Sequence, residues 1–163
     1  MIVNDKMQQG YEYILSEETG KNFAPDFKPE LTPKQMLELG VFEGHYLTDC
    51  INEFPCDWFI NAKLSPLFPD IKQNCFGIKS RMSLRQWQEK GWIIYPDVRG
   101  WFQWYCRYYM GRRLQKIDNI QIQRWKQFKR HYMQIKKNCF AFDFDCRKKQ
   151  RQAILQWAYN PFF

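Results

Sequence analysis

The segment GHYLTDC carries the first side chains with the chemistry of a catalytic site. His45 and Asp49 are four residues apart, and Glu53 follows four residues later. On a continuous helix these side chains share one face, where they would form an acid–base cluster or part of a metal site. The flanking glycines disfavour a continuous helix at this point. We therefore take His45 and Asp49 as candidate catalytic residues.

The turn YPDVRGW supplies a third candidate, Asp97, two residues before Arg99. A carboxylate held by Arg99 and shielded by Trp101 would occupy a setting in which its pKa can be tuned for proton transfer. The alternative is a structural role, because Asp is common in turns and at the start of helices. On residue types alone, the structural role is the more common of the two.

The next segment, GWFQWYCRYYMGRR, places six aromatic residues and three arginines on one predicted helix. A helix that is apolar around most of its circumference is normally buried, which favours a core role. Tyrosine and tryptophan rings beside arginines also form surfaces that stack on bases and bind phosphates. We expect each role for some of these side chains. The candidate ligand-binding residues here are Arg99, Trp101, Trp104, Arg107, Arg112 and Arg113.

A second predicted helix, over residues 118–137, is amphipathic and basic. Its apolar residues recur at steps of three and four, at Ile122, Trp125, Phe128, Tyr132 and Ile135. Its other face carries cations that either contact phosphates or are simply solvated. With the following segment CRKKQRQ, it supplies the remaining binding candidates: Arg124, Lys126, Arg130, Lys137, Arg147 and Arg151.

The charge of the chain is divided unevenly between its halves. Residues 1–80 carry seven lysines against twelve carboxylates, a net of −5, and residues 81–163 carry eighteen cations against five carboxylates, a net of +13. Such asymmetry favours a polyanionic partner for the basic half. The alternatives are a basic surface that keeps the protein in solution, and pairing of the two halves within one molecule or between two copies.

Every strong local signal along the chain is helical. Thr32 with Gln35, Ser83 with Gln86 and Asp118 with Gln121 have the spacing of capping boxes, which begin helices. Further helices are predicted over the aromatic segment and over residues 147–159, whereas WIIYPDVRG reads as a connector. The sequence therefore predicts an all-α fold with about five helices and long irregular connections. Residues 1–31 are expected to form an extended N-terminal arm, and residues 32–163 a single helical domain.

Composition narrows the class of protein. No apolar run approaches the roughly 20 residues of a membrane span, and the N-terminus lacks a secretory signal, so we expect an intracellular protein with no membrane partner. The six cysteines show no C-x-x-C spacing, which favours buried thiols over a metal site or a bridged pair. No phosphate-binding glycine loop or zinc-deaminase pattern is present, so we predict no cofactor and no metal.

Three segments resemble a family of small proteins found in fungi, bacteria and large DNA viruses. They are LTPKQMLELGVFEGHYLTDC, DVRGWFQWYCRYYMGRR and RKKQRQAILQWAY. The resemblance covers residues 31–159, implies one compact unit and carries no activity. The family pattern reads GVFGGKY, DPRG and WAYD, so this chain departs from it at Glu43, His45, Val98 and Asn160. The departure at His45 weakens its candidacy as a catalytic group.

These observations favour a nucleic-acid-binding helical protein whose basic second half contacts phosphates while aromatic and arginine side chains stack on bases. One alternative is a small enzyme that acts on a nucleobase, a nucleotide or another planar substrate, because such an enzyme must hold a phosphate while enclosing a flat ring. Another is a structural protein, such as a virion component, in which the acidic half of one copy meets the basic half of the next.

Overall fold

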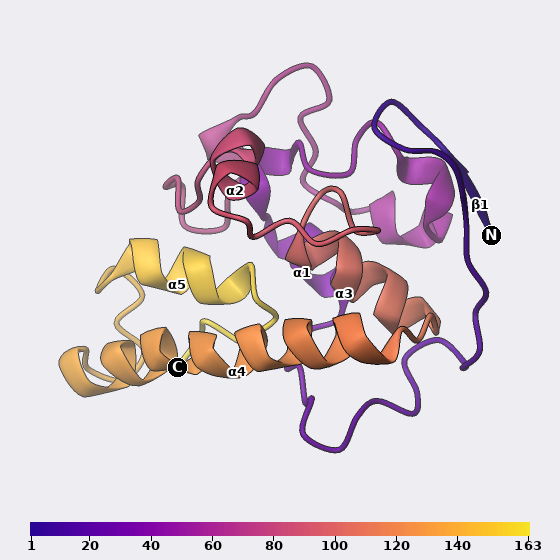
Figure 1. Cartoon of the computed structure of the whole chain (residues 1–163). Coiled ribbons are helices and arrows are strands. Elements are labelled where there is room, and N and C mark those ends of the chain that lie inside the picture. Colours follow the sequence, from indigo (N-terminus) through magenta and orange to yellow (C-terminus); the bar gives the residue numbers. More distant parts are fainter.

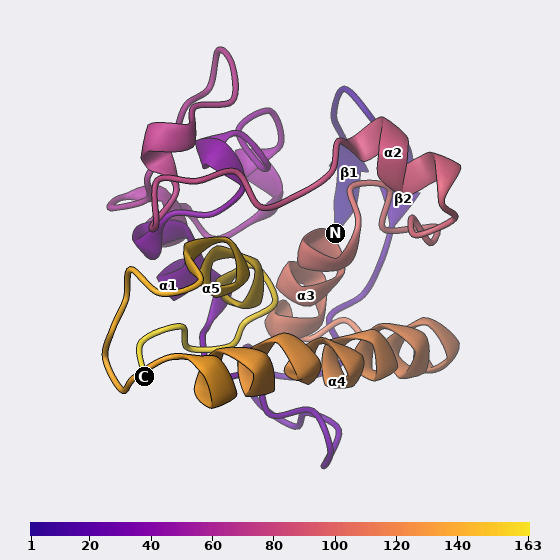
Figure 2. The same cartoon turned by 90° about the vertical axis from the view of Figure 1, so that its left-hand side faces the viewer.

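The computed structural model describes all residues from 1 to 163 and contains five α-helices. Helix α4 is the longest and forms the base of the molecule, with α5 lying along part of it and α3 crossing above it (Figures 1 and 2). The helices are α1 (Pro33–Leu39), α2 (Leu84–Glu89), α3 (Trp101–Met110), α4 (Gln115–Asn138) and α5 (Lys148–Leu155). Four short 3-10 turns lie between α1 and α2: Phe42–Gly44, Ile51–Glu53, Cys56–Phe59 and Ile71–Gln73.

The prediction of a purely α-helical fold is wrong in one respect, because the chain begins with a two-stranded antiparallel hairpin. Strand β1 (Ile2–Asn4) pairs with β2 (Gln9–Glu12). Two short strands are marginally stable on their own. Here the hairpin is held by tertiary contacts, including a hydrogen bond from Gln8 Nε2 to the carbonyl of Pro96. The sequence hides the hairpin because neither strand alternates apolar and polar residues over a useful length.

Residues 13–31 continue as an extended segment that follows the helices closely. The backbone N–H groups of Ser16 and Glu17 both donate to the carbonyl of Gly111, where φ is +120° and a Cβ would lie 2.0 Å from the carbonyl oxygen of Glu17. Phe27 is fully buried, and its ring packs edge-on against Trp125. Phe27 therefore joins the N-terminal segment to the main core.

Helix α3 is the centre of the core. Nine of its ten residues are buried, which confirms the expectation that a helix apolar on most sides is enclosed. Its rings contact neighbours on every side: Trp104 packs on Phe27, Phe102 on Phe42, and Trp101 on Trp157. The helix begins at Gly100 and ends at Gly111, both of which have positive φ.

The predicted capping boxes are confirmed at two of three sites. The hydroxyl of Thr32 accepts from Gln35 N at the start of α1, and Ser83 does the same at the start of α2. The third expectation is wrong, because α4 begins at Gln115 and Asp118 lies within its first turns. Asp118 still organises that end of the helix, since it accepts hydrogen bonds from Leu114 N and from Trp104 Nε1.

The apolar face of α4 is as predicted. Segments without regular secondary structure connect the helices. Residues 92–100 form a connector that includes one isolated bridge, between Ile94 and Asp97. No helix is both long and apolar enough to cross a bilayer. Cys139 and Cys146 form a disulfide just after α4, which corrects the expectation of thiols throughout. A bridged pair was among the alternatives for the six cysteines, with no pair named.

Candidate functional site

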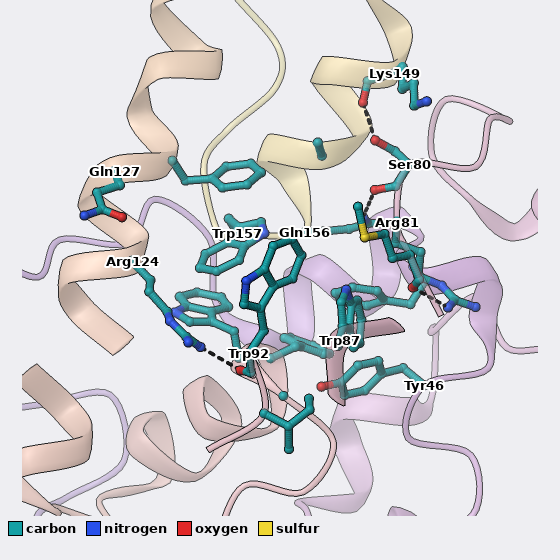
Figure 3. Close-up of a pocket in the computed structure, with 18 of the residues that line it drawn as sticks. Tyr46, Ser80, Arg81, Trp87, Trp92, Arg124, Gln127, Lys149, Gln156 and Trp157 are labelled. Atoms are coloured by element: carbon teal, nitrogen blue, oxygen red, sulfur yellow. Dashed lines mark hydrogen bonds between the residues drawn. The ribbon is translucent and has the colours of Figure 1, made fainter. Parts of the chain in front are cut away.

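A pocket of about 540 Å³ lies between α4, α5, α2 and the start of α3. This volume is within the range of about 300–1,000 Å³ that small-ligand sites occupy. Arg124 and Gln127 reach it from α4, while Ser80 and Arg81 lie on the opposite side (Figure 3). Aromatic side chains dominate the lining: Phe42, Tyr46, Trp87, Trp92, Trp101, Phe102, Phe128 and Trp157.

One wall of the pocket is a column of stacked rings. Phe128 of α4 stacks on Trp157 with ring centroids 4.6 Å apart, and Trp157 packs on Trp101 at the same distance. Trp101 is held in place because its indole N–H donates to the carbonyl of Gln121. The helical spacing that buries one edge of each ring in the core leaves Phe128 and Trp157 only half-buried. Phe128 and Trp157 therefore keep part of their surface accessible in the pocket.

Three of the four cations at the pocket have no carboxylate partner. Arg124 Nη1 donates to the carbonyl of Trp92 at 2.7 Å and contacts Gln121 at 3.3 Å, but it has no acidic partner. Burial lowers the pKa of Arg124, because desolvation disfavours the charged form. Arg130 and Lys149 are exposed at the pocket and form no ion pair. These three cations are available to an anion.

Arg81 differs from the other cations at the pocket. Its Nε donates to the carboxylate of Glu43 at 2.8 Å, and Glu43 is almost completely buried behind it. The loop that carries Arg81 is fixed to α5, since Ser80 donates to the carbonyl of Lys149 and its own carbonyl accepts from Gln156. Arg81 therefore forms part of the pocket wall, and Glu43 partly neutralises its charge.

The pocket lining contains no aspartate, glutamate, histidine or cysteine. Its hydroxyl groups are those of Ser80 and Tyr46, and both donate to backbone carbonyls. Burial raises the pKa of Tyr46, so the phenol stays protonated. General acid–base catalysis needs a side chain that exchanges a proton near neutral pH. The lining therefore suits binding better than proton transfer.

Asp97, one of the three catalytic candidates from the sequence, lies outside this pocket and is completely buried. Its carboxylate accepts from Arg107 Nη1 at 3.1 Å and from Arg112 Nη2 at 2.7 Å. The expectation that Arg99 holds Asp97 is wrong, because Arg107 of α3 and Arg112 just after that helix bind it instead. Enclosed between two guanidinium groups, Asp97 is a structural anion.

Two groups of ion pairs lie in this region, one around Asp97 and one around Arg99. Arg107 also binds Glu53, at 2.6 and 3.1 Å. Arg99 pairs with Asp49 at 2.7 Å and with Asp5 of the hairpin turn at 3.1 Å. We call these seven residues the arginine–carboxylate cluster: Asp5, Asp49, Glu53, Asp97, Arg99, Arg107 and Arg112. Because buried charges persist only when paired, this cluster fixes the hairpin and the turns to α3.

The acid–base cluster expected at His45 and Asp49 is not formed. The segment contains turns and a 3-10 element in place of a helix, so the two side chains do not share a face. His45 Nδ1 lies 3.0 Å from the carbonyl of Ser65, whereas Asp49 faces Arg99. Positive φ at Glu43 and Gly44 breaks the helical path, as the glycines suggested.

The other predicted binding residues are dispersed. Trp104 and Arg151 are fully buried, and Arg151 donates to four backbone carbonyls around the C-terminus. Arg113 lies over the ring of Tyr108, 3.8 Å from its centroid. Lys126 pairs with Asp26 on the side of α4 away from the pocket. The surface role predicted for Trp104, Arg107, Arg112 and Arg151 is therefore incompatible with their burial.

Lys137 and Arg147 remain exposed near the end of α4 and the start of α5. Neither lines the pocket, and Arg147 donates to Gln150 one turn later. Of the twelve predicted binding residues, only Trp101, Arg124 and Arg130 line the pocket.

Sequence reasoning missed the opposite wall of the pocket. Trp87 and Trp92 come from α2 and the connector after it, and Arg81 precedes that helix. Two tryptophans five residues apart beside Arg85 and Lys90 were a usable signal for this wall. The signal was weaker than that of the aromatic segment, because it lies on a short, mostly exposed helix.

Ion pairs inside the molecule join its acidic and basic halves. Five pairs link a carboxylate before residue 81 to a cation after residue 80: Arg81–Glu43, Arg99–Asp5, Arg99–Asp49, Arg107–Glu53 and Lys126–Asp26. Part of the opposite charge of the two halves is therefore paired within one molecule, which was one of the alternatives.

The chain matches no protein-family model, no curated protein and no solved structure.

Proposed function

We propose that this protein binds nucleic acid, with an unstacked base beside Arg124 in the aromatic pocket and the neighbouring phosphates on Arg130 and Lys149. The single observation that supports this most strongly is the composition of the lining. It combines eight aromatic side chains with four cations and no carboxylate. Flat rings bind flat ligands by stacking, and unpaired cations bind anions.

The charge of the lining argues against other ligands of aromatic pockets. Rings that recognise a methylated ammonium group attract a cation through their faces. Arg124 and Lys149 would repel such a ligand, and no carboxylate is present to offset them. An uncharged apolar ligand would leave the desolvated guanidinium of Arg124 without a counterion. A planar anion satisfies both the rings and the cations.

A pocket that takes one unstacked base favours single strands over duplexes. A base within a duplex must be unpaired and unstacked before it can enter, at a cost of a few kcal/mol. A base in a single strand avoids the unpairing cost, and stacking on an aromatic ring contributes about 1–3 kcal/mol per base. Exposed cations along α4 and at the start of α5, such as Lys137 and Lys148, extend the positive surface beyond the pocket.

The enzyme alternative has less support from the geometry. Its candidate acid–base residues Asp97, Asp49 and His45 do not line the pocket, and two of them are engaged in the arginine–carboxylate cluster. A base-removing or base-modifying reaction needs a proton donor or acceptor close to the flipped base. We therefore rank binding above catalysis.

Fluorescence anisotropy with labelled single- and double-stranded DNA and RNA tests the proposal. We expect tighter binding to single strands, and an affinity that falls by orders of magnitude between about 50 and about 200 mM salt. Arg124→Gln and Arg130→Gln should both weaken binding, and the loss for Arg130→Gln should be the same for every sequence because phosphate contacts carry no sequence information. Absence of binding at the lower salt concentration would refute the proposal.

Lys126→Gln is the matched control for those variants. Lys126 lies two residues from Arg124 on the same helix but pairs with Asp26 on another side. The control removes the same charge from α4 without touching the pocket. If Lys126→Gln weakened binding as much as Arg124→Gln, the pocket would have no special part in it.

A further inference from the structure

The hydrogen-bonding groups of the pocket are strongly biased toward donors. The indole N–H groups of Trp87, Trp92 and Trp157 form no hydrogen bond within the protein, although their rings line the pocket. Arg124 uses only Nη1, so its Nε and Nη2 groups are unused donors. Lys149 adds a further donor at the rim.

Side-chain acceptors in the lining are few. The amide oxygen of Gln156 already accepts from Phe42 N and from Gln152 Nε2, so it faces the protein interior. Gln127 offers an amide oxygen, but its side chain is exposed on α4. Apart from the hydroxyl oxygens of Ser80 and Tyr46, a ligand inside the pocket therefore meets many N–H donors and almost no side-chain oxygen that can accept.

This bias distinguishes between the nucleobases. Guanine presents the acceptors O6 and N7, and thymine and uracil present carbonyl oxygens. On the same edge adenine and cytosine present an exocyclic amino group, which must find an acceptor or lose its hydrogen bond to water, whereas the amino group of guanine lies on its opposite edge. A site rich in donors therefore favours bases that carry a carbonyl group in place of the amino group.

Arg124 has the geometry to enforce that choice. The Nε and Nη2 edge of a guanidinium group presents two parallel N–H donors, which match the O6 and N7 acceptors of guanine. The Nη1 contact with the carbonyl of Trp92 holds the side chain beside the aromatic wall (Figure 3). The planar group is thus fixed at one edge and free at the other.

We infer that the pocket selects a single keto nucleobase, guanine before uracil or thymine, and rejects adenine and cytosine. The base stacks against the column formed by Phe128 and Trp157, its acceptor edge faces Arg124, and its phosphate faces Arg130 and Lys149. This inference rests on the proposed function, because it specifies which base the proposed nucleic-acid site holds.

Isothermal titration calorimetry with GMP, AMP, UMP and CMP tests the selection on the whole protein. We expect GMP to bind about tenfold more tightly than AMP, or roughly 1.4 kcal/mol, and UMP to bind more tightly than CMP. Guanosine and inorganic phosphate, titrated separately, should each bind more weakly than GMP because each makes only half of the contacts.

Arg124→Lys separates base selection from charge. It keeps the cation but removes the paired donors, so the ratio of GMP to AMP affinity should fall to within about twofold of one. The matched control Lys126→Gln should leave the ratio at the wild-type value. A second variant, Phe128→Ala, removes a ring without a hydrogen-bond donor and should weaken all four nucleotides alike through lost stacking.

Each remaining outcome has one meaning. Equal binding of the four mononucleotides overturns the base selection. Failure of all four to bind, while single-stranded oligonucleotides bind in the anisotropy experiment, overturns the one-base pocket and leaves the proposed function intact. Failure of both mononucleotides and oligonucleotides overturns the proposed function itself.

Discussion

Two regions of this molecule place arginines beside aromatic rings, and they use them in opposite ways. In the arginine–carboxylate cluster, Arg107 lies about 5 Å from the rings of Tyr11 and Tyr13 and binds two carboxylates. In the pocket, Arg124 lies beside Trp92 and binds none. The presence of a carboxylate, and not of aromatic rings, therefore separates a structural arginine from one available to a ligand.

The physical cost of burial explains the difference. A fully buried guanidinium group without a partner is expensive, so Arg107 persists in the core only with Glu53 and Asp97. Arg124 is only half-buried and retains contact with water, which makes an unpaired charge tolerable. Substitutions in the first region should therefore change stability, and substitutions in the second should change binding.

Arg107→Met should have the largest effect on stability. The change leaves Glu53 and Asp97 buried without their shared partner, and we expect a loss of about 3–5 kcal/mol in the free energy of unfolding. Urea denaturation followed by circular dichroism measures it. Arg124→Met is the control in the other region, with an expected loss below about 1 kcal/mol. Similar losses for the two variants would erase the distinction between the regions.

Asp97→Asn should have the next largest effect. The amide retains the shape of the carboxylate but not its charge, so the bonds from Arg107 and Arg112 weaken by about 1.5–3 kcal/mol in total. A lower midpoint in the same denaturation experiment would confirm Asp97 as a structural anion. An unchanged midpoint, together with loss of an enzymatic activity, would support the catalytic role that the sequence first suggested.

Arg130→Gln should affect binding and leave folding nearly unchanged. Its side chain is exposed at the pocket and forms no ion pair, so stability should change by less than about 0.5 kcal/mol. If Arg130 contacts one phosphate, the slope of log affinity against log salt should become shallower by about 0.9 for duplex or about 0.7 for single strands. A slope that does not change would remove Arg130 from the binding surface.

The smallest expected effect is a dependence of stability on pH through His131. Burial, and then the neighbouring Arg130, lower the pKa of His131 below its ordinary value. The unfolded chain then binds a proton more readily than the folded one, so stability should fall as the pH drops through about 6.5. Thermal unfolding at two pH values, with His131→Gln as the control, measures this contribution. Equal pH dependence in the two proteins would contradict it.

The sequence predicted the elements better than their partners. Local signals located the helices well, because a capping residue such as Thr32 and an apolar stripe such as that of α4 act within a few residues. The hairpin escaped detection, since its strands are held by distant groups such as Pro96. The disulfide between Cys139 and Cys146 also depends on a turn that no local pattern specifies.

The candidate site was predicted only in part. Trp101, Arg124 and Arg130 were expected to bind a ligand and do line the pocket. Residue type and position in a helical segment did not separate them from Arg107 and Arg112, which are also arginines beside aromatic residues. The separation depends on Glu53, which approaches α3 from a remote turn, and on Asp97, which lies just before α3. Such long-range pairing sets which arginines stay free, and it is invisible in the periodicity of one segment.

The most direct test of the central claim uses the tryptophan indole N–H resonances of ¹⁵N-labelled protein. A short single-stranded oligonucleotide that contains guanine is added while the spectrum is recorded. The account predicts shifts for Trp87, Trp92 and Trp157 of the pocket, and none for Trp104, whose N–H is bonded to Asp118 in the core. Shifts at Trp104, with the three pocket resonances unchanged, would contradict the account.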